Sequence, residues 1–154
     1  MTENAGLTIT RVFDAPQRVV YDAWTTPQHF AAWFGGAASD IDVESVILDA
    51  RPGGQWKATM VVRDMDFTID WVGEYLEVTA PTHLALTISD QPGPERETIT
   101  VDLETVPAGT RMVMRQFGGH LTPEQYEQTQ AGYSTFFDAL DDLLARLQAA
   151  HPES

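Results

Sequence analysis

The chain has 154 residues and no cysteine, and its 23 acidic against 9 basic residues give a net charge of −14. This charge repels phosphate backbones and anionic headgroups, so we expect no nucleic-acid binding. The missing cysteine excludes disulfides, thiolate metal sites and cysteine nucleophiles. No apolar stretch reaches the ~18 residues of a membrane span, and the N-terminus lacks a signal-peptide pattern. We therefore expect no membrane insertion, a cytoplasmic location and a single domain over residues 1–154.

The first part of the chain predicts one strand followed by two short helices. Residues 7–14 alternate between apolar and polar side chains, which is typical of a strand. Pro16 suits the first turn of a helix, because its ring already holds the helical φ angle. A second start, Thr26-Pro27, precedes a short apolar segment that carries Trp33.

From residue 41 to residue 117 the apolar side chains recur with a period of two. One apolar face and one polar face indicate an antiparallel sheet that is covered on one side only. The links between the predicted strands are short and rich in proline and glycine, so neighbouring strands should form a meander. The apolar face includes Trp56, Met60, Phe67, Ile69, Trp71, Met112 and Met114.

The end of the chain predicts one long helix. It begins with Thr122-Pro123-Glu124-Gln125, which combines an N-cap threonine, a first-turn proline and a capping-box glutamine. Apolar side chains then recur at helical spacing for about seven turns. An apolar helix stripe and an apolar sheet face of matching length are both buried when the helix packs on the sheet. This predicts an α+β fold. The stripe includes Tyr126, Tyr133, Phe136 and Phe137.

Several motifs accompany this order of elements: RVFDAP at 11–16, VYDAWT at 20–25, FAAWFG at 30–35, DARPGGQW at 49–56 and GEYLEV at 73–78. Together they resemble the family named after the activator of the heat-shock protein 90 ATPase, within the START-like (SRPBCC) superfamily. The resemblance covers nearly the whole chain. It implies a helix-grip fold, in which a curved antiparallel sheet of about six to seven strands wraps a long C-terminal helix. Members of the family include pocket proteins, enzymes and co-chaperones, so the resemblance implies the fold more strongly than the function.

The sequence offers little for metal, cofactor or catalytic chemistry. Its four histidines lack zinc-ligand spacing, and neither Gly35-Gly36 nor Gly53-Gly54 lies in a phosphate-loop motif, so we expect no metal and no cofactor. By alternation, the only polar candidates on the inner sheet face are Tyr75, Glu77 and Gln116. None of them has a partner that would make an acid–base pair, so we assign no catalytic residue.

We expect a small apolar ligand, lipid-like or aromatic, between the sheet and the long helix. A curved sheet and a straight helix cannot touch along their full length, and methionine and large aromatic side chains suit variable apolar shapes. Gly132 within the helix predicts a bend or a close approach. The predicted walls are Trp33, Trp56, Met60, Phe67, Ile69, Trp71, Met112, Met114, Tyr126, Tyr133, Phe136 and Phe137.

Two other functions stay open. A cyclase, dehydratase or isomerase could use the same space, and it would need a buried titratable group with a perturbed pKa. A co-chaperone would need a sizeable exposed apolar patch. For a ligand-binding module we expect a monomer or a weak homodimer.

Overall fold

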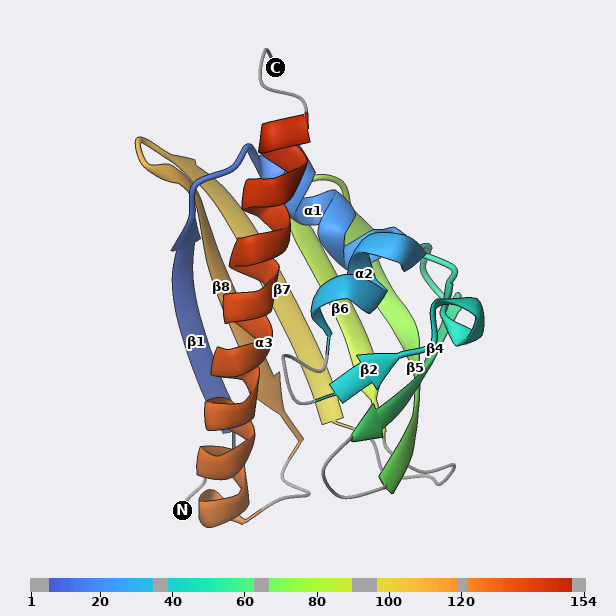
Figure 1. The fold of residues 1–154 in the computed structure, drawn as a ribbon. Coiled ribbons are helices and arrows are strands. Elements are labelled where there is room, and N and C mark those ends of the chain that lie inside the picture. The colour runs from blue at the N-terminus through green and yellow to red at the C-terminus, as the bar shows by residue number, and fades with distance from the viewer. Residues whose placement is uncertain (1–5, 35–38, 63–66, 90–96, 119–121, 151–154) are drawn as a thin grey trace.

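The computed structural model describes residues 6–34, 39–62, 67–89, 97–118 and 122–150. Within them, an N-terminal strand is followed by two short helices, the strands of a sheet and one long helix (Figure 1). The strands are β1 (Gly6–Phe13), β2 (Ser39–Ile41), β3 (Ile47–Leu48), β4 (Gln55–Val62), β5 (Phe67–Thr79), β6 (His83–Ile88), β7 (Glu97–Val106) and β8 (Gly109–Phe117). The helices are α1 (Gln17–Thr25), α2 (Pro27–Trp33), α3 (Pro123–Ala150) and the 3-10 turn η2 (Val43–Ser45).

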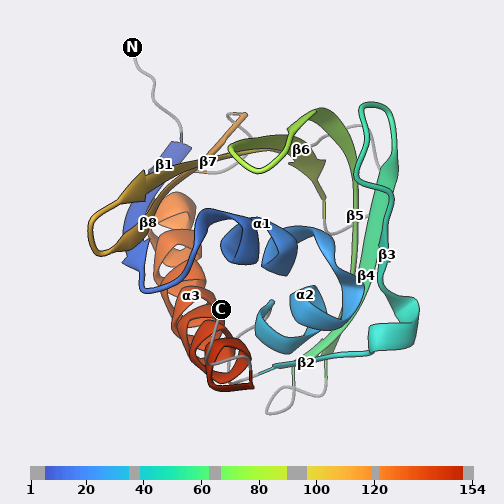
Figure 2. The ribbon, with the colours of Figure 1, turned by 90° about the horizontal axis from the view of Figure 1, so that it is seen from above.

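The strands form one antiparallel sheet in the order β1-β8-β7-β6-β5-β4-β2, with β3 added to β4. Strands β4 to β8 follow each other as the predicted meander, and β1 closes onto β8. Figure 2 shows the sheet curling around α1, α2 and α3, which all lie on its concave side. This is the helix-grip arrangement, and the prediction from the sequence is confirmed.

Alternation along the strands produces the buried concave face. In β7, for example, Ile99, Val101 and Leu103 are buried, whereas Thr100 and Asp102 between them are partly exposed. Strands β1, β4 and β8 alternate in the same way, because successive side chains of a strand point to opposite faces.

The long helix begins as its sequence predicts. The backbone N–H of Gln125 donates to the hydroxyl of Thr122 at 3.1 Å, and the backbone N–H of Thr122 donates to the side-chain oxygen of Gln125 at 2.8 Å. This reciprocal pair is a capping box, and it satisfies two backbone donors that a helix start would otherwise leave unpaired.

The three helices divide the concave face between them. Helix α3 runs along the side of β1 and β8, α1 lies near β7 and β8, and α2 lies on the far side beside β2 (Figures 1 and 2). Arg11, on β1, ties the edge of the sheet to α3, because its guanidinium donates to the backbone oxygen of Ser134 at 3.2 Å and to Asp138 at 3.0 Å. Of the two alternatives predicted at Gly132, a bend or a close approach, the close approach is wrong: a Cβ atom built there would meet nothing within 4 Å.

Candidate functional site

The structure brings the predicted wall residues together on the concave side. Eight of them are buried, between 0% and 5% exposed: Trp33, Trp56, Met60, Met112, Met114, Tyr126, Tyr133 and Phe137. Three are partly exposed and pack against this core: Ile69, Trp71 and Phe136. The twelfth, Phe67, begins β5, and its side chain lies outside the described residues.

Two of the predicted wall residues, Phe137 and Trp71, have different ring neighbours. The Phe137 ring packs against Trp24, Trp33 and Tyr133, with centroid distances of 6.2, 5.9 and 5.9 Å. The ring neighbour of Trp71 is instead Phe34 at 5.9 Å.

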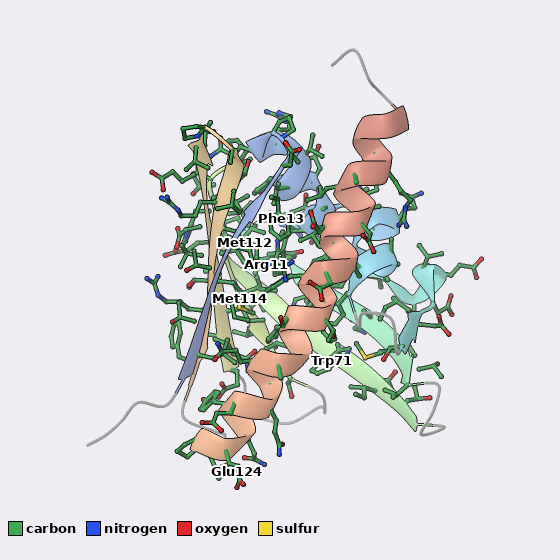
Figure 3. The ribbon with its side chains drawn as sticks, turned by 60° about the vertical axis from the view of Figure 1, so that its left-hand side comes forward. Arg11, Phe13, Trp71, Met112, Met114 and Glu124 are labelled. Atoms are coloured by element: carbon green, nitrogen blue, oxygen red, sulfur yellow. The ribbon has the colours of Figure 1, made fainter. Side chains whose placement is uncertain are left out.

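Phe34 links the sheet to the long helix, since its ring also lies 5.2 Å from that of Phe136 on α3. Sequence reasoning did not place Phe34 among the wall residues, although it directly follows the apolar segment that carries Trp33. In the view of Figure 3, Met112 and Met114 of β8 lie on one side of α3 and Trp71 of β5 lies on the other.

On the concave face of β5, burial decreases towards the beginning of the strand. Tyr75 is 2% exposed, whereas Trp71 and Ile69, further along the same face, are only partly buried. Phe136 of α3 is partly exposed as well, although Tyr133 and Phe137 beside it are buried. We call Phe34, Ile69, Trp71 and Phe136 the Trp71 site. Three of its side chains, Ile69, Trp71 and Phe136, are incompletely covered, and the fourth, Phe34, is 4% exposed.

A buried polar group lies between α3 and the strands β7 and β8. The hydroxyl of Tyr126 donates to Glu97 at 2.7 Å, and the hydroxyl of Tyr133 donates to the side-chain oxygen of Gln116 at 2.7 Å. The amide of Gln116 is 3.4 Å from the same oxygen of Glu97. We call these four residues the polar quartet. Their hydrogen bonds offset the cost of placing polar groups in an apolar interior.

Glu97 is the acidic residue that sequence reasoning missed, and it is 7% exposed. Counting back by two from Ile99, Val101 and Leu103 leads to Glu97. The alternation along β7 therefore predicts that Glu97 points inward. Gln116 lies on the inner face as predicted and is 4% exposed.

Two phenols on the concave side, those of Tyr133 and Tyr75, have raised pKa values and stay protonated. Burial raises the pKa of Tyr133, and the nearby Glu97 carboxylate raises it further. Burial also raises the pKa of Tyr75, with added contributions from Tyr21 and Asp49. Because a charged phenolate is disfavoured there, the Tyr133 hydroxyl acts as a neutral hydrogen-bond donor.

The prediction that Glu77 points inward is wrong. The pairing of β5 with β6 shifts between Tyr75 and Glu77, and this bulge turns Glu77 to the outer face, where it is exposed. There His83 lies between two carboxylates, with Nε2 at 2.7 Å from Glu77 and Nδ1 at 2.7 Å from Asp102. Burial lowers the pKa of His83, but the hydrogen bonds and charges of Asp102 and Glu77 raise it more, and its net pKa lies above the usual value.

The remaining candidates form no metal site in the part of the chain that the structure describes: no three His, Asp or Glu side chains come together to hold an ion. Two of the four histidines, His120 and His151, lie outside the described residues. Among the described helices, none is long and apolar enough to cross a membrane.

The comparisons with known proteins agree with this geometry. The family model described as Activator of Hsp90 ATPase homolog 1-like protein matches residues 14–145. The chain belongs to this family. No curated protein matches it.

Several solved structures share the fold of this Activator of Hsp90 ATPase homolog 1-like chain. A protein of Nitrosomonas europaea is 25% identical, with a TM-score of 0.80 and coverage of 94% of this chain and 97% of the other. A protein of Chromobacterium violaceum is 22% identical, with a TM-score of 0.80 and coverage of 92% and 98%. A protein of Aeromonas hydrophila, described as AHSA1-like, is 21% identical, with a TM-score of 0.77 and coverage of 92% and 93%.

In this family member, the two motifs at 49–56 and 73–78 contact each other. The indole N–H of Trp56 donates to the backbone oxygen of Thr87 at 2.7 Å, and it passes over Gly73, where a Cβ atom would collide with both. Gly53, at φ 84°, donates its backbone N–H to the oxygen of Tyr75 at 2.8 Å. The motifs therefore have a structural role: they hold the loop before β4 against β5.

Proposed function

We propose that the protein binds a small apolar molecule at the Trp71 site, on the concave side of the sheet. The observation that carries the proposal is the incomplete burial of Ile69, Trp71 and Phe136, which point to the concave side from β5 and α3. Most of the other predicted wall residues belong to the buried core instead. A ligand at this site would complete the burial of the three side chains.

The physical driving force is the removal of apolar surface from water. Each Å² of apolar surface buried contributes about 25 cal/mol, and aromatic side chains offer the largest areas. The Trp71 site takes its side chains from α2's end, β5 and α3, so several elements hold its shape. Apolar sites between pre-formed elements are the usual places for small ligands.

The test uses a neutral apolar fluorescent dye, propionyl-dimethylaminonaphthalene, and two matched variants of β5. Ile69→Asn changes the Trp71 site, whereas Leu76→Asn changes an apolar side chain on the same strand that is 43% exposed. We expect Ile69→Asn to weaken dye binding by about tenfold and Leu76→Asn to change it by less than about twofold. Equal effects of the two variants, or a parent protein that binds no dye, would count against the proposal.

A second candidate function, an enzyme of the cyclase, dehydratase or isomerase type, is favoured by the buried carboxylate of Glu97. Its Oε1 accepts a hydrogen bond from the Tyr126 hydroxyl at 2.7 Å, and glutamate is one of the side chains that enzymes use as a general acid or base. Incubation of a metabolite extract with the protein, followed by mass spectrometry, tests this function. A product formed by the parent and not by Glu97→Gln would support it, and identical profiles would exclude it for that extract.

A further inference from the structure

The four tryptophans differ in what their indole N–H groups bind. Trp33 donates to the backbone oxygen of Ala23 at 2.8 Å, and Trp56 donates to that of Thr87 at 2.7 Å. The indole nitrogens of Trp24 and Trp71 are buried, and neither has a hydrogen-bond partner among the described residues. A buried donor without an acceptor is costly, so each of these two groups needs an explanation.

Trp24 is enclosed by other rings. It is 3% exposed, its ring meets that of Trp33 edge to face with centroids 4.8 Å apart, and Phe137 lies at 6.2 Å. Aromatic faces are weak acceptors for an N–H group, and the enclosure leaves no access for a ligand. Trp24 therefore belongs to the core.

Trp71 is in a different position. Its side chain is only partly buried, and it belongs to the site that we propose for the ligand, yet its N–H is shielded from water. Phe34 meets the ring nearly at right angles, with an interplanar angle of 86°, and the other members of the site, Ile69 and Phe136, have no polar side-chain atoms. An indole nitrogen only donates hydrogen bonds, so its missing partner must be an acceptor.

We propose that the Trp71 N–H recognises an acceptor on the ligand, and that the ligand is an apolar molecule with a neutral carbonyl or ether oxygen. This inference rests on the proposed function and names the ligand class of the same site. A neutral acceptor fits better than a carboxylate, because Phe34, Ile69 and Phe136 supply no positive charge to balance a buried anion. The net charge of −14 also disfavours an anionic ligand.

The test compares two probes of the same shape: acetylnaphthalene, a ketone, and isopropenylnaphthalene, in which a CH2 group replaces the oxygen. Their dissociation constants are measured for the parent protein and for Trp71→Phe, which keeps an aromatic ring and removes the N–H. We expect the preference for the ketone to fall by about threefold to tenfold in Trp71→Phe, the size of one hydrogen bond. The affinity for the hydrocarbon should change much less.

Nuclear magnetic resonance of the parent protein provides a second measurement that does not depend on the variant. With nitrogen-15 labelling, the indole N–H signal of Trp71 should move to lower field with the ketone and not with the hydrocarbon. The signals of Trp33 and Trp56 are internal controls, because their N–H groups already have acceptors.

The outcomes separate this inference from the proposed function. If both probes bind, but Trp71→Phe leaves their ratio unchanged and the Trp71 signal responds to both alike, the hydrogen-bond inference is wrong and the apolar site stands. If neither probe binds to the parent protein, both proposals fail.

Discussion

At the scale of the residue, two adjacent side chains on α3 have different roles. Phe137 is 0% exposed and is surrounded by the rings of Trp24, Trp33 and Tyr133, whereas Phe136 is partly exposed and meets Phe34 and Tyr133. Phe137 is therefore core, and Phe136 borders the proposed ligand site. The difference arises from the helix, because consecutive residues lie about 100° apart around its axis.

This difference predicts unequal losses of stability. We expect Phe137→Ala to lower the free energy of unfolding by about 3–5 kcal/mol, since it leaves a cavity in a packed core. Phe136→Ala should cost only about 1–2 kcal/mol, because its ring is incompletely buried in the parent. Urea unfolding of both variants measures the two losses. A loss for Phe137→Ala as small as that for Phe136→Ala would mean that unfilled space borders Phe137 too.

At the scale of the element, the two glycines Gly73 and Gly132 act in opposite ways. Gly73, in β5, leaves the space through which the Trp56 indole reaches Thr87, so a methyl group there collides with both. Gly132, in α3, has open space where a methyl group would go. One glycine is required by packing, and the other only weakens its helix.

The same substitution at these two positions should therefore change stability with opposite signs. We expect Gly73→Ala to destabilise the fold by about 1–3 kcal/mol through overpacking, and to alter the fluorescence of Trp56. Gly132→Ala should stabilise it by about 0.5–1 kcal/mol, because alanine is the better helix former. Denaturant unfolding of both variants provides the comparison. A destabilised Gly132→Ala would indicate that something does pack against that turn of α3.

His83 joins three neighbouring strands, because its ring on β6 binds Glu77 of β5 and Asp102 of β7. Its pKa in the folded protein lies above the usual value, since the hydrogen bonds of the two carboxylates outweigh the effect of burial. A raised pKa means that the folded state binds the proton more tightly than the unfolded chain does. The stabilisation is therefore complete below the unfolded pKa of about 6.5, and it is lost as pH rises through the folded pKa.

The difference in unfolding free energy between the parent and His83→Gln should then be larger at about pH 5.5 than at about pH 8.5. The control is Arg111→Gln, which removes a 2.8 Å ion pair with Glu104 on the same sheet. The ordinary pKa values of glutamate and arginine side chains both lie outside this range, so the effect of the control should be constant. Urea unfolding at both pH values measures the two differences. A His83→Gln effect that did not depend on pH would show that the ring contributes in its neutral form.

At the scale of the whole molecule, the negative net charge determines the electric field that an approaching ligand meets. The net charge of −14 surrounds a concave side whose large side chains are mostly apolar. Two charged side chains near this side already have partners. Arg11 is hydrogen-bonded to α3, and Glu97 is hydrogen-bonded within the polar quartet. A ligand therefore meets a negative outer field and then an apolar site.

This arrangement predicts how salt affects two probes of the same site. An anionic dye, anilinonaphthalene sulfonate, should bind more tightly as salt rises from about 0.01 M to about 0.15 M, because the repulsion is screened over a shorter distance. The neutral dye propionyl-dimethylaminonaphthalene should show no such dependence. Fluorescence titration at the two salt concentrations measures both. An anionic dye that binds more tightly at low salt would reveal a local positive charge that the net charge conceals.

The sequence by itself determined the order of elements, the meander of β4 to β8, the capping box at Thr122 and the family. These follow from local patterns: strand alternation, proline and glycine at the links, and side chains three or four residues apart on a helix. The inward position of Gln116 followed from the same alternation.

The tertiary structure alone decided which of the predicted wall residues are core and which remain partly exposed. A bulge in β5 reversed the direction of Glu77, and alternation counted along the chain cannot anticipate such a shift. Phe34 lies between Trp71 and Phe136 because α2 packs against α3, and Trp71 keeps an unpaired N–H because no acceptor among the described residues reaches it. Local patterns specify the face on which a side chain lies, whereas its neighbours depend on how distant segments pack.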